Sequence, residues 1–179
     1  DALLNFRQGE EPVKREQYLR LCLEQLTRLG GLVEQILDMS MERQRTRELR
    51  LEPVDIGALF DRLAALYRLK SGRPVHFHTA VQPADLTLRA DPEQLSHAVG
   101  NLIDNAIKYP PGEAEVSLSA CCEGTFCILT VSDRGIGIPS ACVGRLFERF
   151  YRVPVGNRHD VKGYGLGLYY VRQVATRHG

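Results

Sequence analysis

A chain of 179 residues, 44% of them hydrophobic, can bury the core of one large domain or of two small ones. Its formal net charge of +1 excludes a strong overall field that would attract nucleic acid, and we expect no nucleic-acid partner. No apolar run in the sequence approaches the roughly 18 residues that a membrane-spanning helix needs. The first residues do not resemble a signal peptide.

The cysteines show no recognisable spacing along the chain. Their number is odd and no Cys-x-x-Cys pair occurs, so the sequence indicates neither a zinc site nor a disulfide framework. Two of them are adjacent in an expected strand and should therefore point to opposite faces of a sheet. We expect reduced, partly buried thiols at Cys22, Cys121, Cys122, Cys127 and Cys142.

Residues 1–48 are predicted to form a helical hairpin. A first helix would end near Gln8, residues 9–12 (GEEP) would break it, and a second helix would run over residues 13–43. One set of positions in the second helix recurs at the alternating three- and four-residue steps of a coiled coil or helical bundle: Leu19, Cys22, Leu26, Leu29, Val33, Ile36 and Ser40.

Such a hairpin has too little core to be stable alone. Two copies would form a four-helix bundle around a twofold axis, so we expect a homodimer through the hairpin. The alternative is that the hairpin packs on the second domain of its own chain.

Residues 49–179 are predicted to form a second domain of helices and strands. Asp55 should cap an amphipathic helix whose apolar residues are Ile56, Leu59, Phe60, Leu63, Leu66, Tyr67 and Leu69. Alternating residues then predict strands over residues 75–79 and 86–89. Asp91 should cap the next helix, which runs to about Tyr109 and is ended by a Pro-Pro-Gly sequence.

Two further strands are expected over residues 116–120 and 125–131, joined through a Glu-Gly turn signal. A long loop and a final helix over residues 165–178 complete the pattern. Helices and strands in this order indicate an α+β fold, a sandwich of a mixed sheet with helices on one face.

Three motifs rich in asparagine or glycine follow one another in the second domain. They are residues 101–109 (NLIDNAIKY), residues 133–139 (DRGIGIP) and residues 163–168 (GYGLGL). Each has an ordinary explanation by itself: a polar helix face, an Asp-x-Gly turn and a glycine-rich loop. It is their ordered combination that indicates a nucleotide site.

The motifs supply the groups that a nucleotide pocket needs. Asn101, Asn105 and Lys108 would share one face of their helix, and an amide oxygen is a suitable ligand for Mg²⁺. The glycines that follow Asp133 let the backbone approach a ligand closely. The glycines at the start of the final helix precede unpaired N–H groups that can bind phosphates.

The three motifs, in this order, resemble the N, G1 and G2 boxes of the sensor histidine kinases, which belong to the gyrase-type ATPase superfamily. Residues 146–152 (LFERFYR) resemble the F box of the same family. The resemblance implies that residues 1–48 are the C-terminal part of a dimerisation domain, half of a dimeric four-helix bundle. Residues 49–179 would be an α/β-sandwich ATP-binding domain of the histidine kinase and gyrase type.

The resemblance also implies a function. The full-length protein would transfer the γ-phosphoryl group of ATP to a histidine, and then to an aspartate on the receiver domain of a response regulator. Transfer of this kind depends mostly on positioning and charge neutralisation. The implied cofactors are therefore ATP and Mg²⁺, and the implied partners are a second copy of the chain and a response regulator.

Individual roles carry over to the matching residues. Asn105 would be the Mg²⁺ ligand, Lys108 would neutralise phosphate charge, and Asp133 would accept a hydrogen bond from the adenine amino group. Residues 140–162 would form a lid over the ATP, with candidate phosphate contacts at Arg149, Arg152, Arg158 and Lys162. The full set of ATP-binding residues implied is Asn101, Asn105, Lys108, Tyr109, Asp133, Gly135, Gly137, Ile138, Phe150, Lys162, Gly163, Gly165, Leu166, Gly167 and Leu168.

The sequence departs from the family at both ends. No histidine stands in the His-Glu-x-x-Thr-Pro context of the phosphoacceptor box, which would fall just before Asp1. We therefore expect the chain to bind ATP without phosphorylating itself, and we assign it no catalytic residue. Relatives usually continue past the final helix into further strands, so we expect a truncated domain with an exposed sheet edge. The chain would be the cytoplasmic portion of an inner-membrane-anchored bacterial sensor, attached to the membrane only through other segments.

Three other functions are compatible with parts of the pattern. One is a non-catalytic nucleotide-sensing module, against which the intact Asn105 and Asp133 argue. Another is a different gyrase-type ATPase, which the heptad pattern of the hairpin disfavours. The last is a dimerising hairpin with an inert second domain, which an absence of ATP binding would indicate.

Overall fold

The computed structural model describes residues 18–20, 22–23, 26, 48–108, 113–153 and 165–179. The chain divides into two compact units, Asp1–Glu48 and Leu49–Gly179. The residues described between positions 18 and 26 are helical, and apart from Glu48 the rest of the predicted helical hairpin lies outside the described residues. In the parts of the chain that the structure describes, no helix combines the length and apolar character that crossing a membrane requires.

The described residues of the second unit form two sheets. The larger has the strand order β2 (Val75–Gln82), β4 (Ala114–Glu123), β5 (Phe126–Asp133). β4 runs parallel to β2 and antiparallel to β5, so the sheet is mixed. In the smaller sheet β1 (Glu52–Asp55) pairs antiparallel with β3 (Thr87–Ala90). Four of these strands overlap those that residue alternation predicted, and β1 is an addition that the sequence did not predict.

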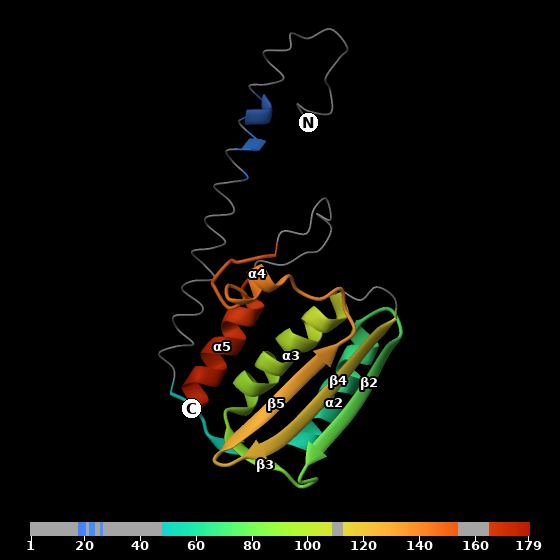
Figure 1. Ribbon diagram of the computed structural model, residues 1–179, viewed down its shortest axis with the longest axis vertical. Helices are drawn as coiled ribbons and strands as arrows, with labels where there is room; N and C mark the ends of the chain where they lie inside the picture. Colours follow the sequence, from blue (N-terminus) through green and yellow to red (C-terminus); the bar gives the residue numbers. More distant parts are fainter. Residues whose placement is uncertain (1–17, 21, 24–25, 27–47, 109–112, 154–164) are drawn as a thin grey trace. The chain divides into compact units, whose positions relative to one another are not determined.

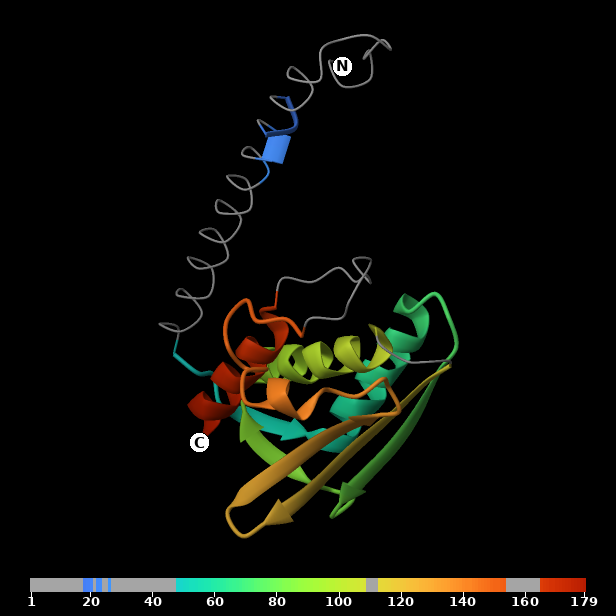
Figure 2. The ribbon, with the colours of Figure 1, turned by 45° about the horizontal axis from the view of Figure 1, so that its top comes forward.

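The helices form a layer on one face of the larger sheet. Figures 1 and 2 show α2 (Ile56–Lys70) and α3 (Pro92–Lys108) against this face, with α5 (Gly167–His178) packed on α3. A short helix, α4 (Ser140–Val143), follows β5. The arrangement confirms the predicted α+β sandwich with a mixed sheet and helices on one face.

The helix α2 begins where the sequence predicted. The Asp55 side chain accepts a hydrogen bond of 2.9 Å from the backbone N–H of Ala58, which satisfies one of the unpaired groups at the helix start. The predicted apolar face was too wide, because Leu66 and Leu69 are 52% and 87% exposed. At about 100° per residue, Leu66 lies roughly a quarter turn from the centre of the buried stripe and Leu69 nearly opposite it.

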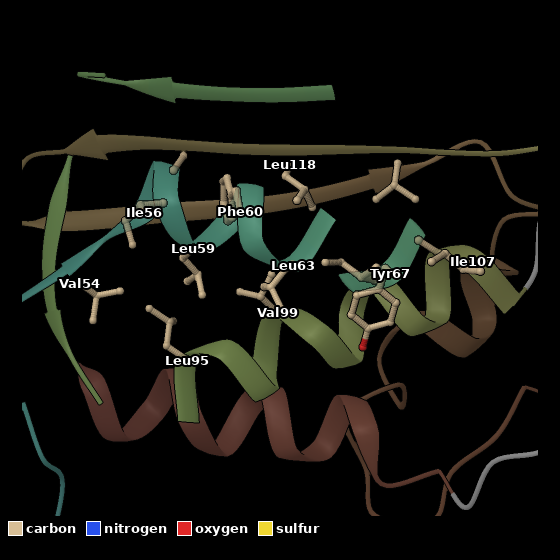
Figure 3. Packing of buried hydrophobic residues seen from close by; sticks show 14 of the residues in the cluster. Val54, Ile56, Leu59, Phe60, Leu63, Tyr67, Leu95, Val99, Ile107 and Leu118 are labelled. Atoms are coloured by element: carbon tan, nitrogen blue, oxygen red, sulfur yellow. The ribbon is translucent and has the colours of Figure 1, made fainter. Parts of the chain in front are cut away.

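The core lies between the helix layer and the sheet. Its fully buried members come from α2, α3 and β4, with Ala90 from β3, and Figure 3 shows how α2 and α3 turn their apolar side chains toward the strands. The largest of these side chains are Phe60, Ile56, Leu59, Ile103, Leu118 and Val116. Burial of each contributes about 1.5–3 kcal/mol, so this cluster is the main reason that the two layers stay together.

The end of the final helix is held to the start of α3. The backbone N–H of Asp91 donates to Nε2 of His178 at 3.0 Å, and Nδ1 of His178 lies 2.8 Å from the carbonyl of Val174. Arg177 donates to the Gln94 side chain at 3.2 Å. Asp91 and Gln94 are the two buried polar residues among those described, so these contacts supply partners that burial makes necessary.

Candidate nucleotide-binding site

The helix α3 presents the asparagine motif on its outward face. Asn101 and Asn105 are half-buried and Lys108 is exposed, as the predicted shared face requires. Ile103 and Ala106 point away from that face and are buried in the core. The apolar side of α3 therefore fixes the helix against the sheet, and the polar side remains accessible to a ligand.

Two contacts that no motif predicted hold α3 in place. The Tyr67 hydroxyl donates a hydrogen bond of 2.9 Å to the carbonyl of Gly100. A Cβ at Gly100 would lie 3.1 Å from that hydroxyl oxygen, so a larger residue would crowd the contact. Burial raises the pKa of Tyr67, and Asp104 raises it further. The signal in the sequence was a glycine inside a helical pattern, which often marks close packing.

The second unpredicted contact joins α3 to α5. The rings of His97 and Tyr170 lie 4.5 Å apart between centroids, tilted by 43°. Tyr170 is buried, and this burial raises the pKa of its hydroxyl. The pair packs the first turn of α5, which begins at Gly167 of the last glycine motif, against α3.

The first glycine motif follows β5 directly. Asp133 is the last residue of β5, and its Oδ1 accepts a hydrogen bond of 2.7 Å from the backbone N–H of Gly135. Gly137 has a φ of 71°, which favours glycine, and a Cβ there would meet no atom within 4 Å. Ile138 is 49% exposed. Asp133 and Ile138 are thus exposed, and Gly135 is half-buried, just at and after the end of the strand.

The last glycine motif reaches the asparagine motif. A Cβ added to Gly167 would lie 3.3 Å from Oδ1 of Asn101, so the start of α5 and the polar face of α3 are in near contact. The α5 N-cap, Leu166, makes no side-chain capping hydrogen bond, and the first turn of α5 contains no acidic residue. The first N–H groups of α5, beginning at Gly167 and Leu168, are therefore suited to bind an anion.

The F-box segment is joined to the same helix start. The backbone N–H of Phe150 donates to the carbonyl of Gly165 at 3.1 Å. A Cβ at Gly165 would lie 2.7 Å from the Phe150 carbonyl carbon and 2.8 Å from the Tyr151 carbonyl oxygen. Gly165 also has a φ of 71°, and Phe150 is a non-glycine residue with a φ of 63°. Only glycine fits at position 165, so close packing accounts for the glycine at this position of the motif.

Arg149, one of the candidate phosphate contacts, packs against aromatic rings. The Arg149 guanidinium lies over the rings of Phe150 and Tyr169, 5.4 and 5.5 Å from their centroids. Cation–π contacts of this kind stabilise by about 0.5–2 kcal/mol, depending on how well they are shielded from water. Arg149 therefore connects the F-box segment to α5 in this structure. The predicted site residues Tyr109, Lys162 and Gly163, and the candidate phosphate contact Arg158, lie outside the described residues.

The described motif residues lie on the polar face of α3, directly after β5 and at the start of α5, an arrangement expected of a nucleotide-binding domain. Comparison with known proteins supports this class. Residues 90–179 match the family described as "Histidine kinase-, DNA gyrase B-, and HSP90-like ATPase".

Curated relatives are named as sensor proteins or as sensor-like histidine kinases. The chain is 35% identical over 171 residues to the Sensor protein CreC of Escherichia coli (strain K12), a match that covers 95% of this chain and 35% of CreC. It is 29% identical over 178 residues to the Sensor-like histidine kinase SenX3 of Mycolicibacterium smegmatis, covering 99% of this chain and 46% of SenX3. The chain thus spans less than half of the length of either relative.

Solved structures of histidine kinases are also similar to this chain. The mycobacterial sensor histidine kinase MprB matches with a TM-score of 0.61 and 32% identity over 72% of this chain and 80% of MprB. Full-length ShkA in complex with AMPPNP matches with a TM-score of 0.66 and 25% identity over 96% of this chain and 35% of ShkA. The chain belongs to the family of histidine kinase-, DNA gyrase B- and HSP90-like ATPases, and it carries the ATP-binding catalytic domain of a two-component sensor histidine kinase.

Proposed function

We propose that ATP binds across the polar face of α3, the end of β5 and the start of α5. The observation that carries this proposal is the near contact between Gly167 and Asn101, 3.3 Å from a built Cβ to the amide oxygen. It brings a helix N-terminus suited to phosphates next to an amide-bearing face suited to a metal ion. The structure of ShkA in complex with AMPPNP supports a nucleotide as the ligand.

Each end of the nucleotide has its own protein groups in this proposal. Asp133 accepts a hydrogen bond from the adenine amino group, and the adjoining Gly135, Gly137 and Ile138 contact the nucleoside through backbone and apolar surface. Lys108 neutralises phosphate charge, and Asn101 lies two turns earlier on the same face of α3. The remaining residues of the proposed set lie at the phosphate end or in the lid: Tyr109, Phe150, Lys162, Gly163, Gly165, Leu166, Gly167 and Leu168.

The residues present fit a magnesium ion bound together with phosphates. The amide oxygen of Asn105 is a hard ligand of the kind that Mg²⁺ accepts. Within the described ranges no three His, Cys, Asp or Glu side chains form a metal cluster, so phosphate oxygens and water would supply the other ligands. When bound, the ion neutralises charge on the phosphate oxygens during phosphoryl transfer.

The proposed role of the whole protein is phosphoryl relay. The γ-phosphoryl group passes to a histidine that lies in the segment preceding Asp1, and from there to an aspartate of a response-regulator receiver domain. This chain's residues bind and orient the ATP, because phosphoryl transfer depends mainly on positioning and charge neutralisation. The names of CreC and SenX3, a sensor protein and a sensor-like histidine kinase, support the relay.

The proposed assembly is a homodimer through the helical hairpin, in the cytoplasmic portion of a membrane-anchored sensor. Leu19 and Leu26 belong to the predicted heptad pattern and are helical in the structure. Apolar positions at heptad spacing on a helix support a second copy as the occupant of that face.

Calorimetric titration with AMPPNP, with and without Mg²⁺, tests the nucleotide site. Asp133→Ala should weaken binding by about ten- to a hundredfold, because it removes a hydrogen bond to a charged group. Asn105→Ala should abolish the dependence of binding on Mg²⁺. Asp61→Ala, which removes an exposed carboxylate of α2, is the matched control and should leave affinity unchanged. Equal binding by Asp133→Ala and the control would refute the assigned site.

Labelling with γ-³²P-ATP tests the relay. This chain should incorporate no phosphate, whereas a longer protein that includes the preceding segment should become labelled on histidine. Binding of AMPPNP by the longer protein without any labelling would favour a nucleotide-sensing module over a kinase. Labelling of this chain by itself would contradict the proposed position of the acceptor histidine.

A further inference from the structure

The β4–β5 hairpin places two cysteines directly opposite each other. Cys122 of β4 and Cys127 of β5 are register partners, next to the pair Glu123 and Phe126 that closes the hairpin. The pairing follows from strand register and has no Cys-x-x-Cys signature. The cysteine pair lies away from the proposed nucleotide site, because Asp133 is at the other end of β5.

The turn determines how the two cysteines face each other. Two residues connect the closing pair of the hairpin, and the first, Gly124, has a φ of 61°, as a type II′ turn requires. In such a hairpin the closing pair is hydrogen-bonded, so the next pair is non-hydrogen-bonded, with Cα atoms about 4.5 Å apart. Disulfides span Cα separations of about 4.4–6.8 Å. The backbone is therefore already placed for a bridge between the two cysteines.

The two thiols are in contact but differ in their surroundings. Cys127 is half-buried against the core cluster, and Cys122 is exposed. Burial raises the pKa of the Cys127 thiol, and the charges of Cys122 and Cys121 and a hydrogen bond with the Cys122 side chain raise it further. Because the thiolate is the nucleophile in disulfide exchange, the exposed Cys122 should react first with a dissolved disulfide.

Strand geometry excludes Cys121 from a bridge with Cys122 or Cys127. Cys121 pairs with Ile128 on one side and with Gln82 of β2 on the other. Successive residues of a strand point to opposite faces, so the Cys121 side chain lies on the face away from Cys122 and Cys127. Cys121 is therefore a matched control, because it shares the strand and local sequence but not the pairing.

We propose that Cys122 and Cys127 form a thiol–disulfide exchange site that reacts with a small-molecule disulfide to close a reversible cross-strand bridge. The Cys122 thiolate attacks one sulfur of the disulfide, displaces the first small thiolate and remains as a mixed disulfide. The Cys127 thiolate then attacks Sγ of Cys122 and displaces the second. The protein loses two electrons and two protons, and the disulfide becomes two thiols.

The test treats the 179-residue chain with graded ratios of oxidised to reduced glutathione, followed by an acid quench and alkylation of free thiols. Intact mass and peptide mapping then report the products. The wild-type chain should lose two hydrogen atoms, carry no glutathione on these two residues and yield a Cys122–Cys127 linked peptide. Reduced glutathione should reverse the change. Cys121→Ser should give the same product.

A second variant tests the proposed order of attack by the two thiols. Cys127→Ser should stop at a stable glutathione adduct on Cys122, because the resolving thiol is gone. Wild-type chain that accumulates glutathione adducts without an internal bridge would overturn the proposal, as would a bridge that uses Cys121 or another cysteine. The wild-type map involves no substitution, so this result does not depend on whether a variant folds.

Discussion

Replacing Gly165 by alanine tests the contact between the F-box segment and the last glycine motif. The new Cβ would lie 2.7 and 2.8 Å from backbone atoms of Phe150 and Tyr151, which cannot rotate away as a flexible side chain could. Gly165 also has a φ of 71°, where an L residue is strained. The substitution therefore imposes both backbone strain and overpacking at one position.

The magnitude follows from these two causes. A left-handed backbone conformation costs a non-glycine residue about 1–2 kcal/mol, and overpacking costs about 1–3 kcal/mol. Gly165→Ala should therefore lower the free energy of unfolding by about 2–5 kcal/mol, a large part of a typical domain stability. Gly72→Ala is the matched control, because Gly72 has a φ of 65° but no atom within 4 Å of its built Cβ.

Denaturant unfolding of both variants measures the difference. Gly72→Ala should show only the strain, so Gly165→Ala should be less stable than the control by about 1–3 kcal/mol. Equal losses of stability, within about 0.5 kcal/mol, would refute the close approach of positions 165 and 150. The comparison cancels the change in unfolded-chain entropy, which is the same glycine-to-alanine change in both variants.

Two further predictions concern the supports of the helix layer. Asp55→Ala should cost about 1 kcal/mol in denaturant unfolding because it removes the cap on Ala58, whereas Asp61→Ala on the same helix should be nearly neutral; equal effects would contradict the capping role. Tyr67→Phe should cost about 1–2 kcal/mol because the Gly100 carbonyl loses a buried donor. The folded-state pKa of Tyr67 lies above its ordinary value, so its contribution is complete below about pH 10 and is lost as the pH rises above that value. A pH titration of stability should therefore fall less steeply above about pH 10 in Tyr67→Phe than in wild type, and identical slopes would contradict this reasoning.

Local features of the fold were predictable because their causes are local. Asp55 and Asp91 were both recognised as caps, and both side chains accept a backbone hydrogen bond from the residue three positions later. The spacing of Asn101, Asn105 and Lys108 put them on one helix face, and this holds because helical geometry alone sets it. β1 was missed since Pro53 weakens a strand pattern, and only pairing with β3 makes this segment a strand.

The width of a buried face was not predictable in the same way. Leu66 and Leu69 look like core residues by composition, yet they are exposed, since the sheet and α3 cover only part of the circumference of α2. Likewise, Arg149 was a candidate for phosphate contact by its charge, whereas its guanidinium lies over two aromatic rings, one of them on α5. The charge or hydrophobicity of a side chain does not predict which neighbouring element it will contact.

By itself the sequence determined the class of protein and the order of most of its elements, β1 and α4 excepted, because motifs and helix caps consist of contiguous residues. The tertiary structure alone decided which distant residues meet. Gly167 reaches Asn101, Gly165 accommodates the backbone of Phe150, and Cys122 faces Cys127. These contacts depend on strand register and helix packing, which are set by the burial of the whole core, so no short stretch of sequence contains them.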